Sequence, residues 1–475
     1  MLDRLRCVLF GLAMALGAGN GFAAEQAVPP NLTLLLADDM GWADVSYHNK
    51  RAETPNIDRL IAAGMELDRF YVAPMCSPTR AGLMTGRYPI RFGLARAVIP
   101  PQRNFGLRTD ETTLPEALTD LGYKNRGVFG KWHLGHRQAQ WHPLRQGFTH
   151  FYGHYNGAID YFQLTRENER DWHSNWTPSP EQGYATELIG EAVCQWIETV
   201  AQQESPYLCY VPFNAPHSPF QAMEEDLQRY ASIGERGAEK RQTIAAMIWR
   251  MDLVIGQILD AVEKTGEAEN TLICFFSDNG GVRTFPNNNK PLRGNKLTVF
   301  EGGVRVPAGI RWPARVTAGQ TSQQVCGYID VLPTLLTAAG EDLTHWTGKP
   351  LDGVNLLPML TEQKLLPERP WFSYHGQSGE QDEHLAMTEK GWKLMVRGPN
   401  LQSSVLTPQH NVSLFHLDED PYETTNLAME EPDRVMKMLP QLVEYRQLQP
   451  LHSVPPYKVK TPGFVPPANW ELKPE

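Results

Sequence analysis

The chain has 475 residues, of which 41% are apolar and 10% are aromatic. This length and composition fit one large folded domain with a smaller one beside it, and they exclude a disordered chain. The net charge of −10 argues against nucleic-acid binding, which needs a basic surface. An anionic ligand would therefore have to be held by a local group of cations or by a metal ion.

Residues 1–24 have the pattern of a secretory signal peptide. Arg4 and Arg6 precede a short apolar run from Cys7 to Leu16, and Gly21-Phe22-Ala23 or Phe22-Ala23-Ala24 could supply the cleavage site. A membrane anchor is the alternative, but the run is too short, and no later segment has the roughly 20 apolar residues of a span. We expect an exported protein, periplasmic or secreted, without stable membrane insertion; the oligomeric state is left open.

Four apolar runs, each ending in a polar motif, are expected to be strands buried on both faces. These runs are Asn31–Leu36, Gly127–Phe129, Tyr207–Phe213 and Thr271–Phe276. Amphipathic helical patterns lie between them at Pro55–Ala63, Ala185–Val200 and Thr243–Val262. This alternation predicts an α/β fold with a large, mostly parallel sheet flanked by helices. Ligands bind beyond the carboxyl ends of such strands, so the four polar motifs should meet at one edge.

The sequence pattern changes after about residue 345. Short strand-like segments follow, then a helix, and then a Pro-rich tail from Gln449 that we expect to lie extended on the surface. The strand-like segments are Trp371–Tyr374, Leu385–Thr388, Trp392–Val396 and Val412–Leu417, and the helix is Pro432–Tyr445. We predict a main α/β domain over residues 25–345 and a C-terminal subdomain over 346–475, with a small antiparallel sheet and an extended tail.

The stretch from Cys76 to Arg80, CSPTR, opens an expected helix that runs on to Thr-Gly-Arg at 85–87. It resembles the signature of the type I sulfatases, arylsulfatase-like members of the alkaline phosphatase superfamily. In that family a formylglycine-generating enzyme oxidises the cysteine to formylglycine, an aldehyde whose hydrate is the nucleophile. The resemblance implies that Cys76 is so converted, with Pro78 and Arg80 at the positions that the modifying enzyme requires. The alternative is an ordinary buried cysteine near a helix start.

Two pairs of oxygen donors follow expected strands, Asp38 with Asp39 and Asp278 with Asn279. Oxygen ligands without Cys or His suit calcium or magnesium rather than zinc. Either pair alone could be a helix cap or a solvated turn. The sulfatase resemblance implies that these four residues bind one calcium ion and that the formylglycine at Cys76 completes the shell.

A second motif, Gly122-Tyr123 through Gly130-Lys131-Trp132-His133, resembles another sulfatase signature, with Asn125 where Ser or Thr is usual. The resemblance implies that Lys131 neutralises a sulfate oxygen. It also implies that His133 hydrogen-bonds the formylglycine and takes the proton that lets the sulfated intermediate collapse. A lone Lys or His is more often a surface or structural residue, so these roles rest on the local match.

His217 and Lys296 also match sulfatase positions, and either could protonate the leaving alkoxide. We favour His217 as the general acid, with Lys296 beside the sulfate. The following segment, Glu301–Pro307, is expected to be a turn and strand that positions Lys296. Together with Arg80 and Lys131, these two residues would form the local cation group that an anionic substrate needs in an acidic chain.

The nature of the substrate is less clear from the sequence. The segment Phe148–Phe162 is rich in aromatic and polar residues, as are Trp172, Trp176 and the later Trp371 and Tyr374. Aromatic faces stack on sugars, which favours O-sulfate on a carbohydrate; a packed aromatic loop is an equal alternative. The partner would be a sulfated glycan or a small sulfate ester.

Two other functions are kept open. One is a phosphonate or phosphate ester hydrolase of the same superfamily, and the other is a non-catalytic, glycan-binding relic.

The spacing of Cys194, Cys209, Cys274 and Cys326 resembles no disulfide framework. We expect no essential disulfide among them.

Overall fold

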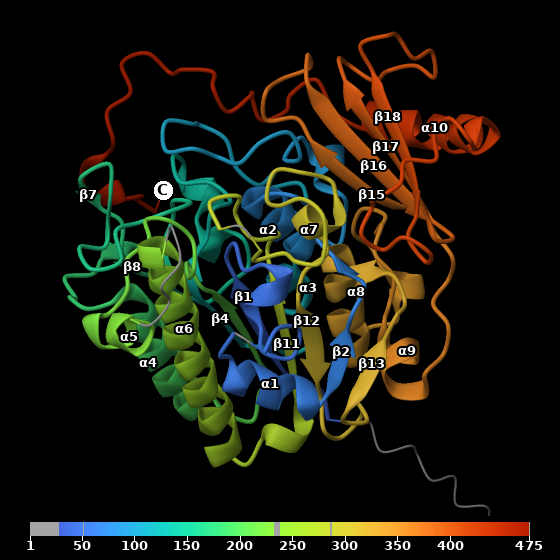
Figure 1. The fold of residues 1–475 in the computed structure, drawn as a ribbon. Coiled ribbons are helices and arrows are strands. Elements are labelled where there is room, and N and C mark those ends of the chain that lie inside the picture. The colour runs from blue at the N-terminus through green and yellow to red at the C-terminus, as the bar shows by residue number, and fades with distance from the viewer. Residues whose placement is uncertain (1–27, 51, 232–237, 286, 475) are drawn as a thin grey trace, which may run out of the picture.

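The fold is known from a computed structural model, which describes residues 28–50, 52–231, 238–285 and 287–474. Its centre is a ten-stranded sheet in the described part of the chain (Figure 1). The strands in spatial order are β13 (Gln320–Ser322), β2 (Met65–Leu67), β12 (Ala308–Arg311), β11 (Thr271–Ser277), β1 (Asn31–Ala37), β10 (Tyr207–Pro212), β4 (Asn125–Lys131), β5 (His150–His154), β8 (His173–Ser174) and β9 (Thr177–Pro178).

The middle of this sheet, from β11 through β5, is parallel, and antiparallel pairs occur only toward its edges. Every residue of β1, β10 and β11 is buried, as expected for near-continuous apolar strands covered on both faces. In β1, Leu34 and Leu36 belong to one core cluster and Leu35 to the other. The predicted α/β fold with a mostly parallel sheet is therefore confirmed.

Helices cover both faces of the sheet. One layer contains α1 (Pro55–Ala62), α4 (Ala185–Val200), α5 (Glu224–Arg229) and α6 (Ala238–Lys264). The opposite layer contains α2 (Cys76–Thr85), α3 (Leu114–Ala117), α8 (Tyr328–Ala338) and α9 (Leu357–Glu362). The three predicted helices of the main domain correspond to α1, α4 and α6. The apolar stripe of each of these helices faces the sheet.

The C-terminal part forms a separate antiparallel sheet, as predicted, with α10 (Pro432–Gln447) against it (Figure 1). Its strands are β15 (Trp371–His375), β16 (Glu383–Glu389), β17 (Trp392–Gly398) and β18 (Asn411–His416). Each contains one of the four predicted segments or nearly all of it. The division at residues 345 and 346 stays a prediction.

The tail after α10 crosses back to the main domain and ends beside the hairpin of β6 (Thr165–Arg166) and β7 (Glu169–Arg170) (Figure 1). There the short helix η7 (Ala468–Trp470) buries Trp470 completely. The indole Nε1 donates to the carbonyl of Arg166 at 2.9 Å, and the ring lies edge-on to His136. The tail is thus extended over the surface, as expected, and its end is anchored in the core.

One local expectation was wrong. Glu301–Val304 form a helical turn, α7, rather than part of a turn and strand, and β12 begins only at Ala308. The reason is the buried Glu301 side chain, which accepts from Tyr71 and Lys393 while the amide of Arg305 donates to the Glu301 carbonyl. A short pair of strands, β3 (Phe70–Tyr71) and β14 (Cys326–Gly327), lies nearby.

Two predictions concern membranes and export. Across the residues that the structure describes, every helix is too short or too polar to cross a bilayer. The predicted signal peptide, residues 1–24, lies outside the described residues. Cys194, Cys209, Cys274 and Cys326 are free thiols, and all but the half-buried Cys194 are buried.

Candidate active site

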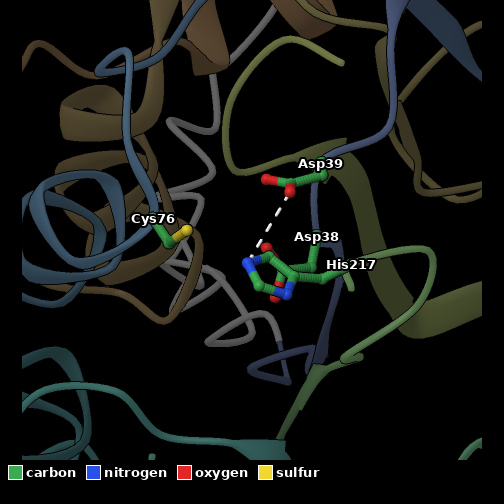
Figure 2. Close-up of side chains that lie close together, drawn as sticks. All are labelled: Asp38, Asp39, Cys76 and His217. Atoms are coloured by element: carbon green, nitrogen blue, oxygen red, sulfur yellow. Dashed lines mark ion pairs between the residues drawn. The ribbon is translucent and has the colours of Figure 1, made fainter. Parts of the chain in front are cut away.

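The four polar motifs meet at the carboxyl edge of the parallel strands. Asp38 and Asp39 follow β1, Asp278 and Asn279 follow β11, and the paired registers of these strands end side by side at Ala37 and Ser277. Ligand atoms of Asp38, Asp39, Cys76 and His217 all lie within 4.8 Å of one another. Figure 2 shows the Cys76 sulfur directed toward the His217 ring, with the two aspartates around it.

Cys76 is the first residue of α2, a helix whose ten residues are all buried. Its position places the side chain at the helix N-terminus, where free amides and the helix dipole favour an anion. Burial raises the pKa of the Cys76 thiol to about 12, against the opposite effect of Lys131 and Lys296. An unmodified Cys76 would therefore stay protonated at neutral pH, which disfavours direct attack by a thiolate.

Arg80 lies one turn further along α2 and is completely buried. Its Nε and Nη2 donate to Asp278 Oδ2 at 3.0 and 2.7 Å, and its Nη1 donates to the Lys131 carbonyl at 2.8 Å. The guanidinium thus connects the β11 edge to the β4 edge and neutralises a carboxylate. These contacts hold the Arg80 guanidinium in place between Asp278 and Lys131.

Lys131, the last residue of β4, is also fully buried and forms an ion pair with Asp38 Oδ2. His133 lies two residues further on with a positive φ of 56°. Its Nε2 lies 3.1 Å from the Ile99 carbonyl, and its buried Nδ1 has no partner among the described residues. Burial, with Lys131 and Arg80, keeps the pKa of His133 well below its ordinary value. The neutral ring therefore donates through Nε2 and offers Nδ1 as an acceptor.

The side chains of Lys296 and His217 belong to different loops, and both lie close to the Asp39 carboxylate. Lys296 Nζ lies 2.5 Å from Asp39 Oδ1 and 3.3 Å from Cys76 Sγ. His217 Nε2 lies 3.7 Å from Asp39 Oδ2, and its Nδ1 lies 2.6 Å from the Ser218 carbonyl. Burial lowers the pKa of His217 to about 3. At rest the His217 ring is neutral and carries its proton on Nδ1, whereas Lys296, beside three carboxylates, stays charged.

The oxygen donors fit a hard cation. In the part of the chain that the structure describes, Asp38 Oδ1 and Asn279 Oδ1 are buried without a hydrogen-bond partner, although other atoms of the same residues are paired. Burial alone would raise the pKa of Asp39, but Lys296 and His217 hold it well below its ordinary value, so Asp39 is ionised. Burial and Asp38 raise the pKa of Asp278 to about 6. Crowded carboxylates and unpaired oxygens are the donor set that calcium prefers.

Most of the aromatic residues that suggested sugar contacts prove to be core residues. Phe151, Tyr155 and Trp172 are completely buried, and Trp371 and Tyr374 nearly so. At β5, Phe151 packs against Tyr155. The ring of Trp172 packs against Tyr152, and that of Trp371, in β15, packs against Tyr328. The packed-loop alternative therefore holds for these five residues.

Tyr161, in the same segment, has a positioning role that its sequence context did not reveal. Its hydroxyl lies 2.5 Å from the Asn214 carbonyl and 2.9 Å from the His217 carbonyl. The ring is almost fully buried, so it fixes the loop that carries His217. The only sequence signal was its place in an aromatic-rich stretch, which does not specify a backbone contact 56 residues away.

Comparison with known proteins identifies the family of this chain. The family model described as Sulfatase matches residues 30–341, which is more than half of the chain. The chain belongs to the sulfatase family. A second family model, the C-terminal part of N-sulphoglucosamine sulphohydrolase, matches residues 294–449 of this sulfatase. The chain is therefore a sulfuric ester hydrolase, and the predicted family and enzyme class are confirmed.

Relatives cover nearly the whole sulfatase. N-acetylgalactosamine-6-sulfatase of Mus musculus is 33% identical, with 97% of this chain and 93% of the relative covered. Arylsulfatase A of Homo sapiens is 30% identical, with 88% and 86% covered. The crystal structure of Ps i-CgsB in complex with k-i-k-neocarrahexaose has a TM-score of 0.79 at 28% identity, covering 89% of this chain and 94% of that one.

Proposed function

We propose that this sulfatase removes an O-sulfate group from a carbohydrate, with Cys76 converted to formylglycine and one calcium ion. The observation that carries the proposal is the group of buried cations and oxygen donors around Cys76. Lys131 and Lys296 concentrate positive charge there in a chain whose net charge is −10. The relatives support the carbohydrate part, since one is a sulfatase of N-acetylgalactosamine and another was crystallised with a neocarrahexaose.

Four residues would hold the calcium ion: Asp38, Asp39, Asp278 and Asn279. When bound, the ion and the aldehyde hydrate at position 76 would supply a polarised sulfate oxygen and an oxygen nucleophile. Arg80 keeps one of these ligands, Asp278, oriented by a two-pronged hydrogen bond. In this arrangement the chain, rather than the solvent, balances the charge of a bound sulfate ester.

The remaining side chains bind sulfate and move protons. We assign Lys131 and Lys296 to the sulfate oxygens, because their ammonium groups lie beside Asp38 and beside Cys76. His133 offers its unpartnered Nδ1 to a proton from the residue at position 76. Each of these groups is held by buried contacts before substrate arrives, which lowers the cost of reorganisation.

His217 is proposed to protonate the leaving alkoxide. At rest it is neutral, with Nε2 free of a proton, so the role requires that a bound anionic ester favour the imidazolium. Lys296 is charged at rest and is the alternative donor. The two assignments differ in what each substitution does to substrates with good and poor leaving groups.

Substrate turnover tests the proposal. The protein is produced together with a formylglycine-generating enzyme and assayed on N-acetylgalactosamine 6-sulfate, sulfated galactan oligosaccharides, an aryl sulfate, and matched phosphate and phosphonate esters. Cys76→Ala is the matched inactive control. The proposal predicts the highest kcat/KM on a sulfated sugar. Faster turnover of the phosphorus esters, or sugar binding without turnover by the converted protein, would contradict it.

We also propose that the sulfatase is exported to the periplasm or the medium. The support is the pattern of residues 1–24, two arginines followed by an apolar run and small residues. N-terminal sequencing of the protein from its native host should begin near residue 24 or 25. An intact Met1 on the mature protein would contradict this proposal.

A further inference from the structure

A cavity of about 740 Å³ is lined by residues 283, 285 and 287–295 and by residues 422–424 of the C-terminal subdomain. Its walls belong to segments that carry active-site residues. Asn295 directly precedes Lys296, and the ring of Phe285 packs at 5.0 Å against Phe220, three residues after His217. The lining thus includes the chain neighbour of Lys296 and a ring that packs on the segment following His217.

The floor of the cavity is tied to the predicted metal ligands. The buried Asn289 side chain accepts from the Gly281 amide at 2.8 Å and donates to the Gly281 carbonyl at 3.0 Å. The same carbonyl accepts from the amide of Lys296 at 3.0 Å, and Gly281 is two residues after Asn279. A ligand held in the cavity would thus be positioned by the same loops that position the chemistry.

The lining is positively charged, unlike the chain as a whole. Arg283, Lys290 and Arg293 are exposed on its surface. Among the described lining residues the one carboxylate, that of Glu423, is fully buried and pairs with Lys393 at 2.9 Å. Among the described residues, neither Arg283 nor Lys290 has an ion-pair partner. Both cations are therefore available to an anionic ligand.

One cation and one aromatic ring of the lining are held in place. The guanidinium of Arg293 donates to the Glu423 carbonyl at 2.6 Å and stacks 4.2 Å from the centre of the Phe300 ring. Tyr422 is 45% exposed, yet its neighbours on both sides are anchored. The Asp420 carboxylate accepts from the amides of residues 424 and 425, and Glu423 accepts from the Glu301 amide. An exposed ring with a fixed backbone is suited to stacking on a sugar.

We propose that this cavity binds the sugar next to the one that loses sulfate, and that the neighbouring sugar carries a carboxylate or a second sulfate. The proposal rests on the proposed carbohydrate sulfatase function and narrows its substrate to an acidic oligosaccharide. Arg283 and Lys290 hold the anionic group, and Tyr422 stacks on the ring. A monosaccharide sulfate or an aryl sulfate fills the catalytic centre alone and gains nothing from the cavity.

The test compares Arg283→Ala/Lys290→Ala with the wild-type protein on three substrates. These are a disaccharide of a uronic acid linked to N-acetylgalactosamine 6-sulfate, the monosaccharide N-acetylgalactosamine 6-sulfate, and an aryl sulfate. The double variant should lose at least about tenfold in kcat/KM on the disaccharide, because two charge-assisted hydrogen bonds are removed. Its rates on the two smaller substrates should stay within about twofold of wild type, since the catalytic contacts are intact.

Two further variants control for charge and for the ring. Lys364→Ala/Lys437→Ala removes two exposed lysines outside the cavity lining and should leave all three rates unchanged. Tyr422→Ala should weaken only disaccharide turnover, by roughly fivefold for a lost stacking contact, while Tyr422→Phe keeps the ring and the rate. Equal losses on all substrates, or an unchanged disaccharide rate in the double variant, would overturn the proposal.

A binding measurement separates this proposal from the proposed function. Calorimetric titration of Cys76→Ala with the same disaccharide reports on the cavity without turnover. If wild type turns over no sulfated sugar, the proposed function fails, and tighter binding by Cys76→Ala than by its Arg283→Ala/Lys290→Ala derivative still supports the cavity. If both bind the disaccharide equally, or neither binds it, the cavity proposal is overturned whatever the activity of the wild type.

Discussion

Glu423, buried beside the ionised Glu301, should keep its proton in the folded protein at pH values where the unfolded chain has lost it, and this makes the stability of the protein depend on pH. The ammonium of Lys393 lies 2.8 Å from the Glu301 carboxylate and 2.9 Å from the Glu423 carboxylate. The Glu301 carboxylate also accepts from the Tyr71 hydroxyl and lies 3.9 Å from the Arg305 guanidinium. Burial, together with Glu301, raises the pKa of Glu423 from 4.5 to about 7, against the effect of Lys393. One lysine thus keeps one carboxylate ionised, and the other prefers its proton.

The sign and size of the effect follow from these values. The folded state holds the Glu423 proton more tightly than the unfolded chain between pH 4.5 and about 7. The contribution of Glu423 to the free energy of unfolding is therefore fully present below about pH 4.5 and is lost as the pH rises through 7. At 1.36 kcal/mol per pKa unit, about 2 to 3 kcal/mol of unfolding free energy should be lost between about pH 5 and 8.

The substitution Glu423→Gln tests this reasoning, because the amide has the shape of a protonated carboxyl and still accepts from the Glu301 amide. Urea unfolding of both proteins at pH 5, 6, 7 and 8 gives the comparison. The variant should match wild type at pH 5 and should be more stable by up to about 2 to 3 kcal/mol at pH 8. Parallel curves over this range would show that Glu423 does not change its protonation, and the reasoning from its raised pKa would be refuted.

Three other substitutions test the roles assigned above. His217→Ala should slow sugar sulfates by about 10²- to 10⁴-fold but activated aryl sulfates far less; equal losses would remove His217 as the general acid. Asp278→Ala should lower the calcium content found by atomic absorption and cost activity that added calcium only partly restores, whereas unchanged metal content would remove it from the ligand set. Trp470→Ala should lower the unfolding free energy by about 3 to 5 kcal/mol because the ring is fully buried; Val465→Ala, at a 74% exposed side chain, should not, and equal stability would refute the tail anchor.

Much of the fold could be predicted because its main signals are local. Near-continuous apolar runs such as Asn31–Leu36 are long enough to identify buried parallel strands, and the stripe of α4 identifies a helix packed on them. The Glu301 segment could not be predicted in this way. Its helical turn depends on the hydrogen bond from Lys393 to Glu301, and these residues are 92 positions apart. The local sequence of Glu301–Pro307 carries no signal for that contact.

The site was predictable to the extent that its residues directly follow strands. Asp38, Lys131 and Asp278 occur where apolar runs stop, and parallel strands bring such positions to one edge. What the sequence could not supply was the partner of each charge. That Arg80 pairs with Asp278, and that the aromatic segment packs inward while Tyr161 fixes the His217 loop, are long-range facts of packing. The cavity beside Lys296 likewise depends on two segments that lie far apart in the chain.

The central claim is that Cys76 is converted to the nucleophile of a sulfatase, and mass spectrometry of the peptide that contains it tests this most directly. The sample is protein from the native host, with its sulfatase activity measured in parallel. A mass about 18 Da below that of the thiol peptide would show formylglycine, since replacing CH2SH by CHO removes this mass. An intact thiol at position 76 in fully active protein would contradict the account.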